Sequence, residues 1–239
     1  MADTLNNTIA AIEEKAGPAL RAVIFDLDGV LIYSAPCHRD AFIEVFRPLG
    51  IENFDYSRFA GWRTREVVDL ITAEAGLSLS ESELAGIAAR KSERARQMMA
   101  VSHPVASGCV EMLQRLCESG LVLALASSGS RESVGMFLDT TETRPLFRSV
   151  LTGGDVKHAK PDPEIYTRTF QRIGLDPAEG IIVEDAVAGV LAARAAGSQA
   201  VGIAGTCLAE DLKAAGALDV LDAVATLPAW LAGLRKESC

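Results

Sequence analysis

Two acidic residues mark the end of an apolar run near the start of the sequence. The run 21–27 is mostly apolar and contains Asp26, and Asp28 and Gly29 come directly after it. Carboxylates at positions i and i+2 point to the same side of an extended segment, and they repel each other unless a cation compensates them. A hard divalent cation held by oxygen ligands does so, and Gly29 lets the chain turn sharply beside the pair. The pattern favours a metal site over its alternative, a solvated strand end followed by a turn.

A second acidic pair has the same setting. Glu184 and Asp185 follow the apolar run 181–183 and precede an alanine-rich stretch. Acids at the N-terminus of a helix are stabilising without any ligand. For this pair taken alone, that explanation carries as much weight as a metal site. If the two apolar runs are strands of one sheet, Asp185 approaches Asp26 and Asp28, and the three form an oxygen-rich site for Mg²⁺. We expect Glu184 to belong to the same site.

Hydroxyl groups and one lysine complete the candidate chemistry. Ser127 and Ser128 follow the apolar run 121–126, and hydroxyls and backbone N–H groups at such a strand end can hold phosphate oxygens. Lys160 lies in the segment 158–163, whose two prolines stiffen the loop and can aim the lysine. A cation is needed where several carboxylates and a phosphate share a pocket. Ordinary loop hydroxyls and a solvated surface lysine are the alternatives.

Short apolar runs alternate with helical patterns along much of the chain. The runs predict five strands, over residues 21–27, 121–126, 148–152, 181–183 and 200–203. The helices predicted between them cover residues 110–118, 163–174 and 187–196. This alternation is typical of a parallel sheet with helices on both faces, which binds ligands beyond the carboxyl ends of its strands. The acids and hydroxyls described above fall at those ends, which indicates a single site.

The segment 33–104 has a different pattern. It contains no convincing strand, and its helical stretches are 38–47, 64–75 and 81–99. We therefore predict an α/β fold with a Rossmann-like, doubly wound parallel sheet as the core, formed by residues 1–32 and 105–239, and a small inserted all-helical cap domain, formed by residues 33–104. The apolar segment 218–234 is expected to pack on the core, and residues 1–17 to form a short helical extension or a loose tail.

Composition excludes several classes of partner. The net charge is −9, from 23 basic and 32 acidic residues, which makes nucleic acid a poor partner. Five cysteines with no C-x-x-C spacing predict reduced thiols and no disulfide framework or zinc site. The sequence has no run of about 18 apolar residues that would span a membrane. We expect a cytoplasmic protein in which any phosphate is bound by local groups.

Four motifs occur in the order known from one superfamily of enzymes. They are FDLDGV, LALASS, HAKPDP and VEDAVAG, within residues 21–205. Together they resemble the haloacid dehalogenase-like hydrolase superfamily. The insert between the first two motifs resembles the small helical cap of the β-phosphoglucomutase and phosphoglycolate phosphatase-like branch.

The resemblance implies a role for each core residue. Asp26 attacks phosphorus and forms an aspartyl-phosphate, and Asp28 protonates the leaving oxygen and then activates water. Magnesium is held by the Asp26 side chain, the Asp28 backbone carbonyl and the Asp185 side chain, while Glu184 orients a metal-bound water or the lysine. The side chains that hold the phosphoryl oxygens are Ser127, Ser128 and Lys160.

The cap segment both matches and departs from the branch. The positions of Tyr33 and Ala35 often carry acids in relatives, so a polar contact is lost here. The cap residues expected to face the substrate are His38, Trp62, Arg63, Arg65 and Lys91. An arginine can bind a second anion with two parallel hydrogen bonds, and a tryptophan can stack on a sugar. Half-buried or solvated side chains are the alternatives, and for Lys91 a solvated position on a highly charged helix is favoured.

Three functions are compatible with these residues. The leading interpretation is a phosphatase acting on a small phosphorylated metabolite, such as a sugar phosphate. A β-phosphoglucomutase-type phosphotransferase uses the same core chemistry and differs in the acceptor of the phosphoryl group. A non-catalytic protein that binds a phosphate ligand on the same fold is the third, and it is weakened because none of the core acids is lost. The expected oligomeric state is a monomer or a weak homodimer.

Overall fold

A parallel sheet of six strands forms the centre of the computed structural model, which describes residues 20–237. The extension or tail expected over residues 1–17 lies outside this range. The strand order is β3-β2-β1-β4-β5-β6. The strands are β1 (Ala22–Phe25), β2 (Val122–Ala126), β3 (Phe147–Leu151), β4 (Gly180–Glu184), β5 (Gln199–Ile203) and β6 (Val220–Leu221). The five predicted strands are therefore present, with ends that differ by one or two residues, and β6 was not predicted.

The register of the sheet brings the motifs together at one edge. Phe25 of β1 pairs with Leu125 of β2 on one side and with Val183 of β4 on the other. All strands run the same way, so the residues that follow these positions emerge side by side. β1 is buried on both faces of the sheet, which explains its continuous apolar sequence.

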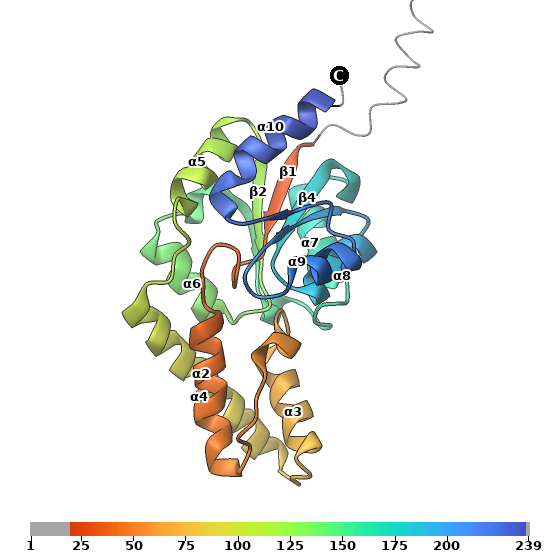
Figure 1. Cartoon of the computed structure of the whole chain (residues 1–239). Coiled ribbons are helices and arrows are strands. Elements are labelled where there is room, and N and C mark those ends of the chain that lie inside the picture. The colour runs from red at the N-terminus through yellow and green to blue at the C-terminus, as the bar shows by residue number, and fades with distance from the viewer. Residues whose placement is uncertain (1–19, 238–239) are drawn as a thin grey trace, which may run out of the picture.

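Helices cover both faces of the sheet (Figure 1). The face shared by Val23 and Phe25 packs against α5 (Cys109–Glu118), α6 (Arg131–Thr140) and α10 (Leu227–Glu237). The opposite face, which contains Ile24, packs against α7 (Glu164–Ile173), α8 (Val187–Ala195) and α9 (Ala209–Ala215). This confirms the predicted doubly wound core. Leu231 of α10 is buried in the first cluster, as expected for the apolar C-terminal segment.

Between β1 and β2 the chain forms a separate group of helices, which lies beyond the carboxyl end of the sheet (Figure 1). Its members are α2 (Ala35–Phe46), α3 (Thr64–Glu74) and α4 (Glu81–Ser102). They enclose their own hydrophobic cluster, centred on Phe42, Phe46, Phe59, Val68 and Ile87. An independent core of this kind supports the proposed cap, and we use this name for residues 33–104.

The remaining helical segments are short. They are the 3-10 helices η1 (Arg47–Leu49), η2 (Tyr56–Phe59), η3 (Arg144–Leu146), η4 (Gly153–Asp155), η5 (Pro177–Glu179) and η6 (Val224–Thr226). The longest helix, α4, has 22 residues but is strongly charged. Within residues 20–237, none of the helices combines the length and the apolar character needed to cross a bilayer.

The cap cluster leads to a prediction for stability. Phe46 is fully buried, with ring centroids of Phe42 and Phe54 at 5.5 and 5.3 Å. Phe46→Ala leaves a cavity and is expected to lower the free energy of unfolding by about 3–5 kcal/mol, measured by urea denaturation. The control is Val101→Ala in α4, because Val101 is 84% exposed and should change stability by less than ~0.5 kcal/mol. Equal effects of the two substitutions would contradict an independent cap core.

Candidate active site

A buried lysine joins two carboxylates at the carboxyl end of the sheet. Lys160 Nζ donates hydrogen bonds to Asp26 Oδ1 at 2.5 Å and to Glu184 Oε1 at 2.6 Å, and it lies 3.3 Å from the carbonyl oxygen of Ala126. All three charged side chains are buried. Burial opposes the charged lysine, but Asp26 and Glu184 outweigh this effect and raise the pKa of Lys160 well above its usual value. The lysine is a charged partner of the carboxylates and is not solvated.

Glu184 uses both carboxylate oxygens within the protein. Besides Lys160, Oε1 accepts a hydrogen bond from the Tyr166 hydroxyl at 2.6 Å. Oε2 accepts bonds from the backbone N–H groups of Asp185 and Ala186 at 3.0 and 3.2 Å. With these partners Glu184 is placed to orient Lys160, and its expected part in metal binding stays a prediction. Sequence reasoning missed Tyr166, which follows the HAKPDP motif by three positions and belongs to none of the four motifs.

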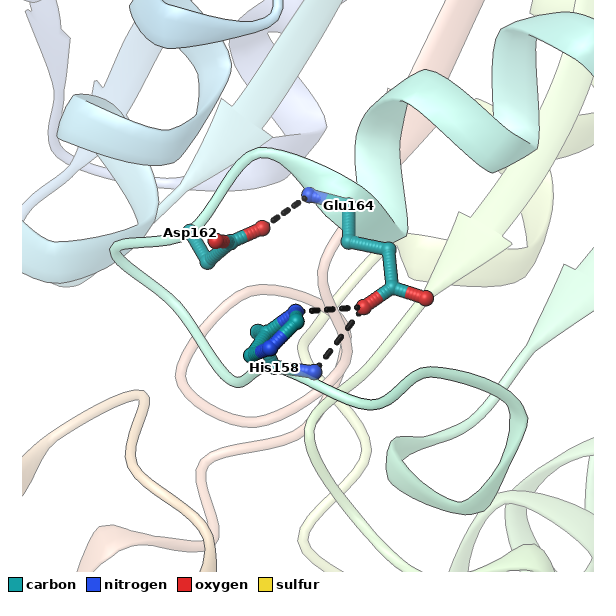
Figure 2. A group of neighbouring side chains, drawn as sticks. All are labelled: His158, Asp162 and Glu164. Atoms are coloured by element: carbon teal, nitrogen blue, oxygen red, sulfur yellow. Dashed lines mark hydrogen bonds and ion pairs between the residues drawn. The ribbon is translucent and has the colours of Figure 1, made fainter.

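The loop that carries Lys160 is fastened by its own side chains (Figure 2). Glu164 Oε2 accepts hydrogen bonds from the backbone N–H groups of Lys157 and His158, both at 2.9 Å, and lies 3.2 Å from His158 Nδ1. Asp162 Oδ1 accepts a hydrogen bond from the backbone N–H of Glu164 at 2.9 Å. Figure 2 shows that His158, Asp162 and Glu164 form a compact group of potential metal ligands. Their hydrogen bonds hold the loop closed, and this explains why the three side chains lie together.

Asp28 faces the cap. Its Oδ1 accepts a hydrogen bond from Ser34 Oγ at 2.5 Å and lies 2.9 Å from His38 Nε2. Burial raises the pKa of Asp28, but His38, Ser34 and the more distant Lys91 outweigh it and bring this pKa to about 2. Strand β1 ends at Phe25, directly before the pair formed by Asp26 and Asp28. Both residues line one pocket.

Lys91 is buried, so the solvated position favoured for it is wrong. It is only 2% exposed, and Nζ lies 2.7 Å from His38 Nδ1 and 4.1 Å from the centre of the Phe42 ring. Burial lowers the pKa of Lys91 to about 7, although Asp28 opposes this change. Burial and the Lys91 ammonium also lower the pKa of His38. A chain of contacts therefore runs from Lys91 through His38 to Asp28.

Asp185 and Asp26 carry negative charge that the protein itself compensates incompletely. Burial raises the pKa of Asp26 to about 7 even though Lys160 opposes the rise. Burial, together with the carboxylates of Glu184 and Asp26, raises the pKa of Asp185 well above its usual value. A Cβ atom at Gly29 would lie 1.7 Å from Asp185 Oδ2, so only glycine fits beside this carboxylate. Buried oxygen donors with excess negative charge fit a hard divalent cation such as Mg²⁺.

The two serines at the end of β2 differ in their contacts. Ser127 is buried, and its Oγ accepts a hydrogen bond from the backbone N–H of Gly129 at 2.9 Å. Ser128 Oγ donates to the carbonyl oxygen of Gly61 in the cap at 2.7 Å. Ser128 lines the pocket together with Asp26 and therefore links the predicted phosphate site to the cap. The roles of both serines in phosphate binding stay predictions.

A pocket of about 210 Å³ lies between the core and the cap. Four of the five cap residues singled out from the sequence line it, namely His38, Trp62, Arg63 and Lys91. The fifth, Arg65, is not among the lining residues and forms ion pairs with Asp69 at 2.7 Å and Glu81 at 2.6 Å. Lining residues that the sequence did not reveal include Phe42, Tyr56, Phe59 and Thr64. They belong to no motif, and only the folded cap brings them to the pocket.

Comparison with known proteins agrees with this geometry. The model of the haloacid dehalogenase-like hydrolase family matches residues 20–197. Validoxylamine A 7'-phosphate phosphatase from Streptomyces hygroscopicus subsp. limoneus is 34% identical over 203 residues, which cover 83% of this chain and 92% of that protein.

Solved structures of the same fold include a β-phosphoglucomutase and a CbbY protein. β-Phosphoglucomutase from Clostridium difficile superposes with a TM-score of 0.80 at 25% identity, covering 92% of this chain and 97% of that one. A mutant of CbbY from Rhodobacter sphaeroides, in complex with xylulose-(1,5)bisphosphate, gives a TM-score of 0.75 at 26% identity, covering 87% and 96%. The expected Rossmann-like core and the resemblance drawn from the four motifs are both confirmed. The chain belongs to the haloacid dehalogenase-like hydrolase family.

Proposed function

We propose that this protein is a magnesium-dependent phosphatase that hydrolyses a small sugar phosphate or a related ester through an aspartyl-phosphate on Asp26. The prediction of a phosphoric monoester hydrolase is confirmed at the level of the family. The observation that carries the finer proposal is that Asp26, paired with the buried Lys160, and Asp28, held by the cap, line the same pocket. The proposed nucleophile, Asp26, and the proposed acid–base group, Asp28, are therefore held by different partners.

The residues support a two-step transfer. One Asp26 oxygen attacks phosphorus, the P–O bond to the leaving group breaks, and Asp28 donates its proton to the departing oxygen. In the second step Asp28 removes a proton from water, which attacks phosphorus and releases Asp26 and inorganic phosphate. Lys160 stabilises negative charge on Asp26 and the phosphoryl group.

The metal and the protonation of Asp28 complete this account. Mg²⁺, held by the side chains of Asp26 and Asp185 and the backbone carbonyl of Asp28, would neutralise charge on the transferring group. In the free protein the pKa of Asp28 is about 2, so Asp28 must gain a proton before it can act as an acid. The negative charge of a bound phosphate ester favours this protonation.

A phosphotransferase is the second candidate, and one observation favours it. The carboxylate of Asp28 is held by Ser34 and His38, which both belong to the cap. Acid–base chemistry is therefore tied to a closed cap, and closure excludes water. The two functions are separated by incubating the protein with β-glucose 1-phosphate and a bisphosphate primer. Glucose 6-phosphate without free phosphate would favour the transferase, and stoichiometric free phosphate would favour the phosphatase.

The first prediction of this proposal concerns the two acids. Asp26→Asn removes the nucleophile and is expected to abolish Mg²⁺-dependent phosphate release from p-nitrophenyl phosphate. Asp28→Asn keeps the nucleophile and is expected to lower kcat for sugar phosphates by roughly 10²–10⁴-fold. The control is Asp139→Asn on α6, whose side chain is exposed, with unchanged activity. Full activity of Asp26→Asn would refute an aspartyl-phosphate at this position.

The second prediction concerns pH and metal. The pKa values of Asp26 and Asp185 are raised, Asp26 to about 7 from 3.8, so these two groups bind more protons in the metal-free folded protein than in the unfolded chain between these pH values. Their contribution to stability therefore falls as pH rises from about 4 to 7. Because Mg²⁺ replaces these protons, its stabilising effect should be larger near pH 7.5 than near pH 5.5.

This effect is measured as the change in Tm on adding Mg²⁺ at the two pH values. Asp26→Asn removes one of the titrating carboxylates and should reduce the change in Tm at the higher pH. Asp28 has a pKa of about 2 and titrates below this window. A change in Tm that is equal at both pH values, or larger at the lower one, would contradict the proposed metal site.

A further inference from the structure

Apart from its charged members, the wall of the pocket is mainly aromatic and hydroxylic. Its aromatic members are Phe42, Tyr56, Phe59 and Trp62, and its neutral polar members include Thr64, Ser92 and Ser133. Trp62 is 37% exposed at the pocket, with its ring against Phe59 at 5.8 Å. Aromatic faces suit the C–H face of a sugar, and hydroxyls suit its polar edge. This wall fits a neutral polyhydroxy group.

The cations near this wall are already engaged. Arg63 Nη2 donates to the carbonyl oxygen of Val156 at 2.8 Å, and Nη1 donates to that of Lys157 at 3.0 Å. Lys91 is buried against His38 and Phe42. Either Arg63 or Arg65 was expected to bind a second anion, and Arg65 is paired with Asp69 and Glu81 outside the pocket. Among the described residues that line the pocket, each arginine and lysine has such a contact, and Arg63 Nε, which has no hydrogen-bond partner, is buried.

Arg63 has a different task in this arrangement. The carbonyls that it binds belong to the segment that leads to Lys160, and Glu164 holds the N–H of the same Lys157 from the other side. The guanidinium thus fastens the cap to the loop that carries the lysine of the active site. Ser128 and Gly61 form a second bond between core and cap.

We propose that the pocket accepts singly phosphorylated sugars or polyols and discriminates against bisphosphates, because Arg63 serves as a clamp between the cap and the Lys160 loop and not as a site for a second phosphate. This inference rests on the proposed phosphatase function. Proteins similar to this chain include a Streptomyces phosphatase named for a monophosphate and a CbbY mutant solved in complex with a bisphosphate. A second dianion would have to be buried without a free cation, which is costly.

The first experiment compares substrates with the full chain and Mg²⁺. The substrates are glucose 6-phosphate and sorbitol 6-phosphate as monophosphates, and fructose 1,6-bisphosphate and xylulose 1,5-bisphosphate as bisphosphates. We expect kcat/KM to be roughly 10²-fold higher for the better monophosphate than for either bisphosphate. An equal or higher value for a bisphosphate overturns the inference and leaves the phosphatase function intact. Absence of hydrolysis of all four esters and of p-nitrophenyl phosphate would instead refute the phosphatase function.

The second experiment separates a clamp from an anion site. Arg63→Met is expected to lower kcat/KM by a similar factor for monophosphates and bisphosphates, whereas loss of an anion site would affect mainly the bisphosphates. Arg63→Lys can still donate to one of the two carbonyls and should restore part of the activity at unchanged Tm. The matched control is Arg94→Met, because Arg94 pairs with Glu44 within the cap and lies outside the pocket. A loss confined to bisphosphates, or no rescue by lysine, contradicts the clamp.

Discussion

The buried contact between Lys160, Asp26 and Glu184 is the interaction on which the site depends. Two carboxylates at adjacent strand ends repel each other, and removing them from water makes this worse. One ammonium group within 2.6 Å of both offsets the repulsion and fixes the position of Asp26. Asp185 takes no part in this contact, so the negative charge of its carboxylate remains for a further cation to compensate. The parallel register of β1 and β4 causes this crowding, because it brings the acids at the ends of the two strands side by side.

The chemistry is divided between two parts of the chain. In the proposed mechanism the core fixes the nucleophile Asp26, whereas the cap holds the acid–base group Asp28 through Ser34 and His38. His38 Nδ1 and Lys91 Nζ lie 2.7 Å apart, so one of the two must accept a hydrogen bond and cannot carry a proton there. The lowered pKa values of both groups are consistent with this. A cap that moved away would take the partners of Asp28 with it.

The sequence predicted the core better than the cap, for a physical reason. In a parallel sheet every strand ends at the same edge, so residues after buried runs converge whatever lies between them, and Asp26 and Glu184 could be placed together. Pocket residues of the cap depend on helix packing, which has no such rule. The charged neighbours of Lys91 hid its burial, and Arg63 could not be distinguished from Arg65. The two-residue strand β6 is too short to leave a pattern.

Close packing around the carboxylates also accounts for the composition of α8. A Cβ atom at Gly189 would lie 1.9 Å from a Glu184 carboxylate oxygen, so this position of the helix has no room for a side chain. Glycine weakens a helix by about 1 kcal/mol relative to alanine, and its presence in the first turn is explained by the carboxylate. Ala192 and Ala193 are fully buried on the same helix. Larger side chains here would push α8 away from β4 and open the space around Glu184, on which the position of Lys160 depends.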